Sequence, residues 1–308
     1  MIDFRYHLIS IIAIFLALAA GVALGAGPLN EPFNEQLASE ADRDRQDKDQ
    51  LRAELTAAED VASFQNAFAR EVGSDLLTGR LQDRTVALFA LPDTDDETVK
   101  GLTKQIAAAG GKVTTTVQVH DKMLDPTEQQ FAEGVARQAL DGQQDAPDIS
   151  GMSSYQMLGT TLARAYLGDG SETKFDSTSG TIASAYRQAG FTETKGKPSG
   201  RASLAVFVTP GANDLTENQD ELVATVAGAA DTASSGAVVT GPPSSAIDGG
   251  AVAYLRSNDI GDSVSTVDAV TVPAGQVVTV LALQRESSGN SGHYGVEDGA
   301  DQALPGVG

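Results

Sequence analysis

The residues with the most distinctive chemistry in this chain are His120 and Met123, an imidazole and a thioether three positions apart. Monovalent copper prefers such soft donors, so the pair is a candidate metal site. The same spacing often arises by chance, however, and methionine more often fills a hydrophobic core. We therefore treat His120 and Met123 as weak metal candidates and predict no cofactor from the residues alone.

The sequence contains few residues of the types that carry out catalysis. The chain has no cysteine, which excludes disulfides, thiolate metal sites and a thiol nucleophile. Of the three histidines, His7 adjoins an apolar segment and His293 lies near the C-terminus, so His120 is the one base within the expected folded domain. No Gly-x-Ser-x-Gly elbow accompanies it. We expect no enzymatic activity and assign no catalytic residue.

Two loops that follow predicted strands have the position of a nucleotide site but not its chemistry. The first carries Asp93, Asp95 and Asp96 without a glycine, whereas a phosphate cradle needs bare backbone amides. The second, residues 241–245 (GPPSS), offers two hydroxyls but is typical of an ordinary capped helix start. The net charge of −21 also argues against a broad nucleic-acid surface. We predict no nucleotide or nucleic-acid ligand.

An apolar segment near the N-terminus is expected to attach the rest of the chain to a membrane. Residues 8–26 contain nineteen residues without a charge, which as a helix would rise about 28 Å, close to the thickness of a bilayer core. We predict a transmembrane helix over residues 8–27, ended by Gly27-Pro28. The alternative is a cleaved signal peptide, for which residues 23–25 (ALG) have the small-x-small spacing.

The charges on either side of this segment predict its orientation. Arg5 and the terminal amine precede it, and the first charges after it are the acidic Glu31 and Glu35. Basic flanks stay in the cytoplasm. Residues 1–7 are therefore expected to form a cytoplasmic stub of a single-pass plasma-membrane protein, with the bulk of the chain exported.

Small residues within the membrane segment favour pairing of two copies. Ala17, Gly21 and Gly25 follow one another at intervals of four, which places them on one helix face and lets two helices approach closely in lipid. Glycine and alanine are also common in membrane helices in general, so this stripe alone is a modest argument for a homodimer.

A helical stalk is expected between the membrane and the folded domain, over residues 30–78. Asn30 is a plausible cap, and after Pro32 the stretch contains no proline and one glycine, Gly73. Residues 41–50 (ADRDRQDKDQ) are polar on every face, which is typical of a solvated spacer. Further on, apolar residues recur at the spacing of a coiled coil that would pair in a parallel homodimer; they are Leu51, Leu55, Ala58, Val61, Phe68 and Val72.

The folded domain is predicted over residues 84–285 as an α/β domain with a Rossmann-like, mainly parallel sheet. Apolar strand-like runs at 85–91, 112–119, 203–208, 237–240, 264–267 and 277–283 alternate with helical segments, a pattern typical of a sheet covered on both faces. Residues 286–308 are rich in glycine, serine and acid, so we expect a disordered acidic tail.

Several longer motifs give the chain a family resemblance. The opening residues 2–29 (IDFRYHLISIIAIFLALAAGVALGAGPL) continue in order through residues 76–92 (LLTGRLQDRTVALFALP), 107–113 (AAAGGKV) and 291–305 (SGHYGVEDGADQALP). Together they resemble the actinobacterial copper-transport protein B family (MctB), which is also represented by the cell-separation protein SteB.

The resemblance implies an envelope protein with a role in copper efflux or homeostasis, and it is the sole argument for copper as a ligand. The alternative it implies is a non-catalytic scaffold that links a cytoplasmic partner to peptidoglycan hydrolases during cell separation. Arg5, Tyr6 and His7 of the stub would then contact the cytoplasmic partner. One spanning segment per chain makes an autonomous pore improbable.

Overall fold

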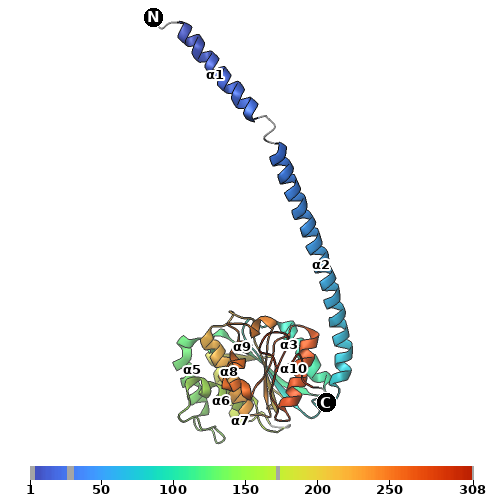
Figure 1. The fold of residues 1–308 in the computed structure, drawn as a ribbon. Helices are drawn as coiled ribbons and strands as arrows, with labels where there is room; N and C mark the ends of the chain where they lie inside the picture. The colour runs from blue at the N-terminus through green and yellow to red at the C-terminus, as the bar shows by residue number, and fades with distance from the viewer. Residues whose placement is uncertain (1–3, 26–30, 171–173, 307–308) are drawn as a thin grey trace. The chain divides into compact units, whose positions relative to one another are not determined.

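The computed structural model describes residues 4–25, 31–170 and 174–306. The chain divides into two compact units, Met1–Phe64 and Gln65–Gly308. The first holds helix α1 (Phe4–Gly25) and most of helix α2 (Glu31–Leu77) (Figure 1). The predicted helix end at Gly27-Pro28 and the predicted cap Asn30 lie outside the described residues.

Helix α2 is held together by local interactions along most of its length. Its residues are mainly good helix formers, and side chains three or four positions apart pair along its surface. Arg45 is 3.2 Å from Asp42, and the Gln50 amide donates to Glu54 at 2.9 Å. Such exposed pairs contribute only a few tenths of a kcal/mol each. The predicted helical segment is therefore confirmed as one continuous helix.

The second unit is built on a mostly parallel sheet of seven strands. In spatial order they are β3-β2-β1-β4-β5-β6-β7, and β3 alone among them runs antiparallel to its neighbour. This confirms the predicted mixed α/β class. The strands are β1 (Thr85–Ala90), β2 (Lys112–Val119), β3 (Thr192–Thr194), β4 (Leu204–Val208), β5 (Ala237–Thr240), β6 (Ser265–Val267) and β7 (His293–Tyr294).

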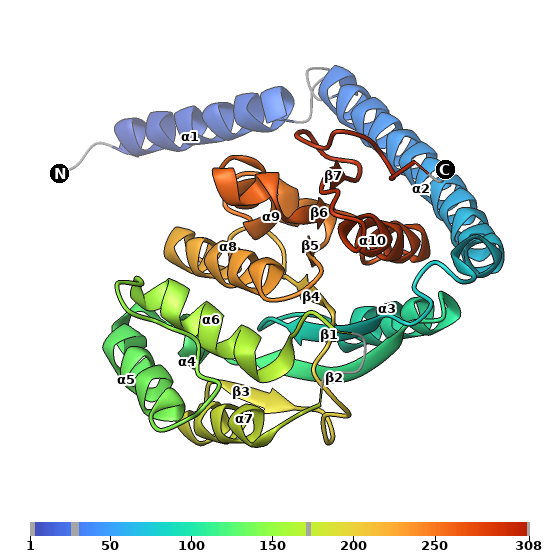
Figure 2. The ribbon, with the colours of Figure 1, turned by 90° about the horizontal axis from the view of Figure 1, so that it is seen from below.

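Helices cover both faces of this sheet, as Figure 2 shows. Alternating side chains of β1 enter opposite cores, with Val86 and Leu88 on one face and Ala87 and Phe89 on the other. One face is covered by α3 (Asp96–Ala108), α10 (Pro273–Glu286) and the end of α2. The other is covered by α6 (Ser154–Tyr166), α8 (Glu217–Thr232) and α9 (Ala251–Arg256), with α5 (Gln129–Leu140) and α7 (Ser177–Ala189) packed on α6.

Short helical turns complete the connections. They are α4 (Asp121–Leu124), η1 (Pro126–Glu128), η2 (Pro243–Ala246) and η3 (Asp259–Asp262).

The predicted strand at residues 277–283 is wrong, because these residues lie inside α10. The run VVTVLAL is apolar at nearly every position, so it satisfies the period of a strand and of a helix equally. Pro273 at the helix start and burial of the run between α3 and the sheet favour the helix.

The predicted disorder of the tail also differs from the structure. Residues 287–306 are described, and His293–Tyr294 form β7 in parallel register with β6. Tyr294 is buried. Gly295 has a φ of 145°, and a Cβ there would lie 1.9 Å from Asp268 Oδ1, so only glycine allows this close approach.

A buried ion pair holds the tail to the domain. Arg256 and Asp268, with side chains 5% and 0% exposed, are joined by a 3.0 Å contact. The Arg256 guanidinium also donates to Tyr294 O at 3.0 Å, while Asp268 accepts the Val296 N–H at 2.7 Å. Contacts between residues 12 to 42 positions apart leave no local pattern in the sequence, which is why the tail resembled a disordered segment.

We expect Arg256→Ala to lower the free energy of unfolding by about 3–5 kcal/mol, because it leaves the Asp268 carboxylate buried without its cation. Arg137→Ala is the matched control, since Arg137 pairs with Glu133 at the surface and its loss should cost about 1 kcal/mol or less. Urea unfolding of the detergent-solubilised chain, followed by circular dichroism, measures both. Equal losses in the two variants would contradict the assigned role of the ion pair.

A second buried carboxyl group lies at the end of α10. Glu286 is 4% exposed, and its Oε1 accepts the Ser265 N–H at 2.7 Å. Burial raises the pKa of Glu286 to about 7, and the nearby Asp231 adds to this shift. The folded chain therefore holds Glu286 protonated in a range where the unfolded chain ionises it.

We expect this group to make the folded chain less stable as pH rises from about 4.5 to about 7. Below that range the group is neutral in both states, and above it the accumulated cost is at most about 3 kcal/mol. Glu286→Gln should remove this part of the pH dependence and raise stability at pH 8, whereas Glu71→Gln, at an exposed position of α2, should not. Parallel profiles for wild type and Glu286→Gln would refute the assignment.

Candidate functional site

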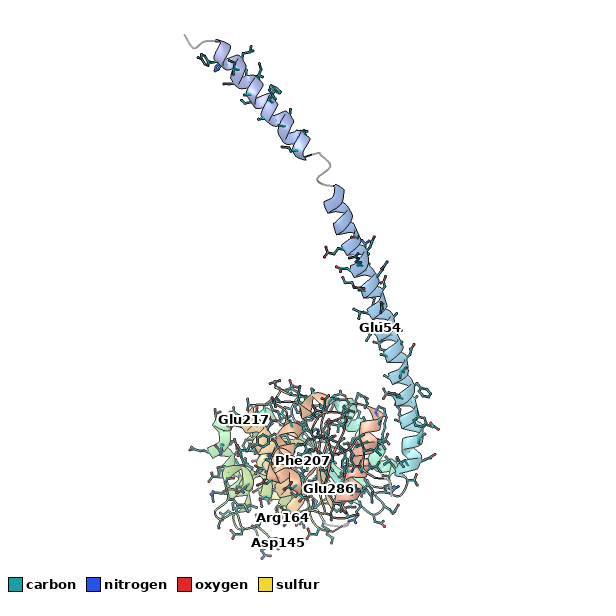
Figure 3. The ribbon with its side chains drawn as sticks, viewed as in Figure 1. Glu54, Asp145, Arg164, Phe207, Glu217 and Glu286 are labelled. Atoms are coloured by element: carbon teal, nitrogen blue, oxygen red, sulfur yellow. The ribbon has the colours of Figure 1, made fainter. Side chains whose placement is uncertain are left out.

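The first functional element is the apolar surface of α1. Residues Tyr6–Gly25 are long and apolar enough to cross a membrane, and the large side chains of this helix are exposed. Such a surface is unfavourable in water, at about 25 cal/mol for each Å². Figure 3 shows these side chains projecting on all sides of the helix.

The predicted packing stripe lies on this helix. A Cβ at Gly21 would meet nothing within 4 Å apart from its chain neighbours and the backbone of its own helix. At 100° per residue, Ala17, Gly21 and Gly25 face one side. Tyr6 and His7 are exposed at the start of the helix, and Arg5 is helical there. The roles predicted for these residues stay predictions.

The second element is a set of exposed apolar side chains on α2. Six large ones are between 43% and 71% exposed, and Ala58 is exposed with them. They include every large residue predicted to pair, and also Phe64, which the sequence pattern missed because it lies beside the expected seam rather than on it. The six are Leu51, Leu55, Val61, Phe64, Phe68 and Val72.

The last turns of α2 dock on the domain. A Cβ at Gly73 would lie 2.6 Å from Val277 Cγ2, so the backbone of α2 approaches α10 closely at this point. Leu77 and Leu81 are fully buried in the core between α3, α10 and the sheet. The sequence identified Gly73 as the one glycine of the stalk but did not assign it this contact.

His120 and Met123 lie in different environments. His120 precedes α4, its side chain is partly exposed, and its backbone N–H donates to Phe191 O at 2.9 Å. The Met123 side chain is buried in the hydrophobic core together with Leu124. Met123 therefore acts as a core residue, and the spacing alone does not build a soft-metal site.

The remaining soft donors are dispersed as well. Met157 is buried in the core, and Met152 Sδ accepts a hydrogen bond from Thr160. His293 Nδ1 is 3.0 Å from Thr266 Oγ1, and burial lowers the pKa of His293. Within the described parts of the chain, no group of three or more His, Cys, Asp or Glu residues is arranged to hold a metal ion.

Parallel sheets commonly bind ligands at the carboxyl ends of their strands. In this domain, polar groups at that edge form hydrogen bonds with one another. Both Leu91 N and Thr94 Oγ1 donate to Val208 O at 3.0 Å, which ties the loop after β1 to the end of β4. Asp95 caps α3 by accepting the Thr98 N–H at 3.0 Å, and this bond lowers the pKa of Asp95. The loop acids therefore serve local structure.

Other polar residues at this edge also form ion pairs or hydrogen bonds within the domain. Asp96 pairs with Lys195 at 2.5 Å, which lowers the pKa of Asp96. After β5, Ser245 donates to Pro242 O at 2.7 Å, and Gly241 N donates to Val267 O at 2.9 Å. The GPPSS segment thus begins the short turn η2.

Comparison with known proteins connects this architecture to one family. The family model described as "Copper transport outer membrane protein, MctB" matches residues 1–305. The copper transporter MctB of Mycobacterium tuberculosis (strain ATCC 25618 / H37Rv) is 30% identical over 315 residues, covering 97% of this chain and 98% of that protein. The copper transporter MctB of Mycobacterium leprae (strain TN) is 30% identical over 328 residues, with the same coverage.

Proposed function

Because the chain belongs to the MctB copper-transport family, we propose that it takes part in copper efflux or homeostasis as a single-pass envelope protein. The observation that carries this proposal is the match over almost the whole chain, residues 1–305. Copper is the cargo in this proposal, and no resident cofactor is assigned.

The proposed topology places residues 1–7 in the cytoplasm, the apolar part of α1 across the plasma membrane and the rest of the chain outside. The support is Arg5 in the first turn of α1, before the apolar part, and Glu31 and Glu35 after the helix. We propose that the chain does not form a pore by itself, because α1 is the one described helix suited to span a bilayer. The exported domain is proposed to be non-catalytic.

The finer architecture is proposed to be a Rossmann-like domain carried on a paired stalk. The sheet order, with strands added outward on both sides of β1 and β4, supports the first part. The exposed apolar residues of α2 and the small residues Ala17, Gly21 and Gly25 on one face of α1 support a parallel homodimer, since a second copy would pack against both surfaces.

A second candidate function is a non-catalytic scaffold for cell separation. It would bind a cytoplasmic partner through Arg5, Tyr6 and His7, and cell-wall proteins, including peptidoglycan hydrolases, through its exported part. The observation that favours it is the exposed apolar surface of α2, which offers protein contacts.

Deletion of the chain is expected to lower copper tolerance, and re-expression of the full chain should restore it. Because Met123 is a core residue, His120→Ala should restore tolerance as well as the wild type does. Growth across a copper series, with a zinc series as control, measures this. Unchanged copper tolerance, together with no copper binding tighter than about 1 μM by the full chain, would remove the support for the copper role. Failed daughter-cell separation in that strain would instead favour the scaffold.

The double substitution Gly21→Leu, Gly25→Leu is expected to reduce crosslinking between copies in membranes several-fold, because the larger side chains keep the two helices apart. Ala19→Leu, Ala23→Leu is the matched control, since these positions lie on the opposite side of α1. Equal crosslinking yields in both double variants would refute pairing through the small-residue face.

A further inference from the structure

The C-terminal segment, residues 291–305, returns to the sheet after α10 and lies along β6. Thr266 N donates to Gly292 O at 3.1 Å, and Gly292 N donates to Ser265 Oγ at 3.1 Å. Strand β7 has two residues and forms the end of the sheet beside β6 (Figure 2). Because so short a strand gains little from its own hydrogen bonds, side chains must contribute to the attachment of this segment.

One such attachment runs from α9 through β6 to β7. Arg256 Nε donates to Thr266 Oγ1 at 3.0 Å, and Thr266 Oγ1 lies 3.0 Å from His293 Nδ1. A guanidinium can only donate, so the hydroxyl oxygen accepts from Arg256 and keeps its own proton for another acceptor. Thr266 is fully buried, and His293 Nδ1 is the one partner for that proton among the described residues. His293 therefore accepts at Nδ1, which makes it a neutral imidazole with its proton on Nε2.

The surroundings of His293 favour this neutral form. Burial has the largest effect and lowers the pKa of His293, and the charge of Arg256 in α9 lowers it further. Asp301 of the C-terminal segment and Asp262 of η3 act in the opposite direction without reversing the shift. The imidazole lies against the backbone of η3, since a Cβ at Gly261 would be 3.4 Å from His293 Cε1. The folded chain thus holds His293 neutral to a lower pH than the unfolded chain does.

We propose that protonation of His293 is a switch that loosens the C-terminal segment from β6 in mildly acidic solution. A proton on Nδ1 takes away the acceptor of the buried Thr266 hydroxyl, which is then left without a partner. It also places an imidazolium near the Arg256 guanidinium, and the two cations repel each other. Arg256 donates to Tyr294 O at 3.0 Å, so a displaced guanidinium weakens a second hydrogen bond to the same segment.

This switch acts in the direction opposite to Glu286. Attachment through His293 weakens as pH falls below about 6.5, because the released imidazole binds a proton more readily than the attached one. Burial of Glu286 instead costs stability as pH rises. The two groups bind neighbouring residues of β6, Ser265 and Thr266. Loosening the segment in acid uncovers the edge of β6 and the buried Tyr294 ring, and an uncovered strand edge is available for pairing with another chain.

Hydrogen exchange of the full chain in lipid nanodiscs, followed by mass spectrometry, tests this switch. After correction for the intrinsic effect of pH on exchange, the amides of residues 291–302 should lose protection about three- to thirtyfold between about pH 7.5 and about pH 5. The lower figure corresponds to one lost hydrogen bond, and the upper figure to full protonation of the released imidazole. His293→Asn, whose side-chain oxygen can accept from Thr266 without titrating, should be equally protected at both pH values. His120→Asn is the matched control and should behave as the wild type does.

A second measurement uses the wild-type chain with ¹⁵N-labelled histidine. At about pH 7.5, NMR should find the His293 imidazole neutral, with its proton on Nε2. The proposal is overturned if the wild-type segment keeps its protection at about pH 5, if His293→Asn loses protection as the wild type does, or if His293 carries its proton on Nδ1. Equal loss of protection in β1 (Thr85–Ala90) would also overturn it, because the whole domain rather than this segment would then be opening.

Discussion

The structure depends on the constraint that α1 cannot remain in water. Its twenty residues from Tyr6 to Gly25 expose apolar side chains on every face, and no helix of this kind is stable in solution without a lipid or protein surface around it. The sequence immediately changes character in α2, which carries charges along much of its surface and is compatible with water. An apolar helix suited to lipid is thus followed directly by a charged helix suited to water, which is the pattern on which the proposed membrane anchor depends.

In the domain that follows, both faces of a sheet with short strands must be buried. Strands of two to eight residues gain little from their own hydrogen bonds, so the two helix layers supply most of the stability. Loops at the carboxyl edge bind one another, as Thr94 and Val208 do.

Local sequence patterns predicted most of the helices and strands but few of the contacts between them. The strands at 85–90 and 112–119 were predicted to within about a residue, because a short strand-like run bounded by other residue types is a local signal. The prediction of a strand at residues 277–283 was wrong because this run is apolar at nearly every position and therefore fits the period of a helix as well as that of a strand. The Arg256–Asp268 pair depends on residues that only the tertiary fold brings together, so it could not be inferred from spacing. His120 and Met123 show the reverse, a suggestive spacing that the fold does not use.

The close approach of Gly73 to Val277 has a mechanical consequence. Because Gly73 has no side chain, the Val277 side chain lies directly against the backbone of α2, and a twist or pull on the last turns of α2 is passed to α10 through this contact. Helix α10 in turn lies against β5 and β6, so the strain would spread into the sheet itself. The contact between Gly73 and Val277 is therefore a point at which a force on α2 would enter the folded domain.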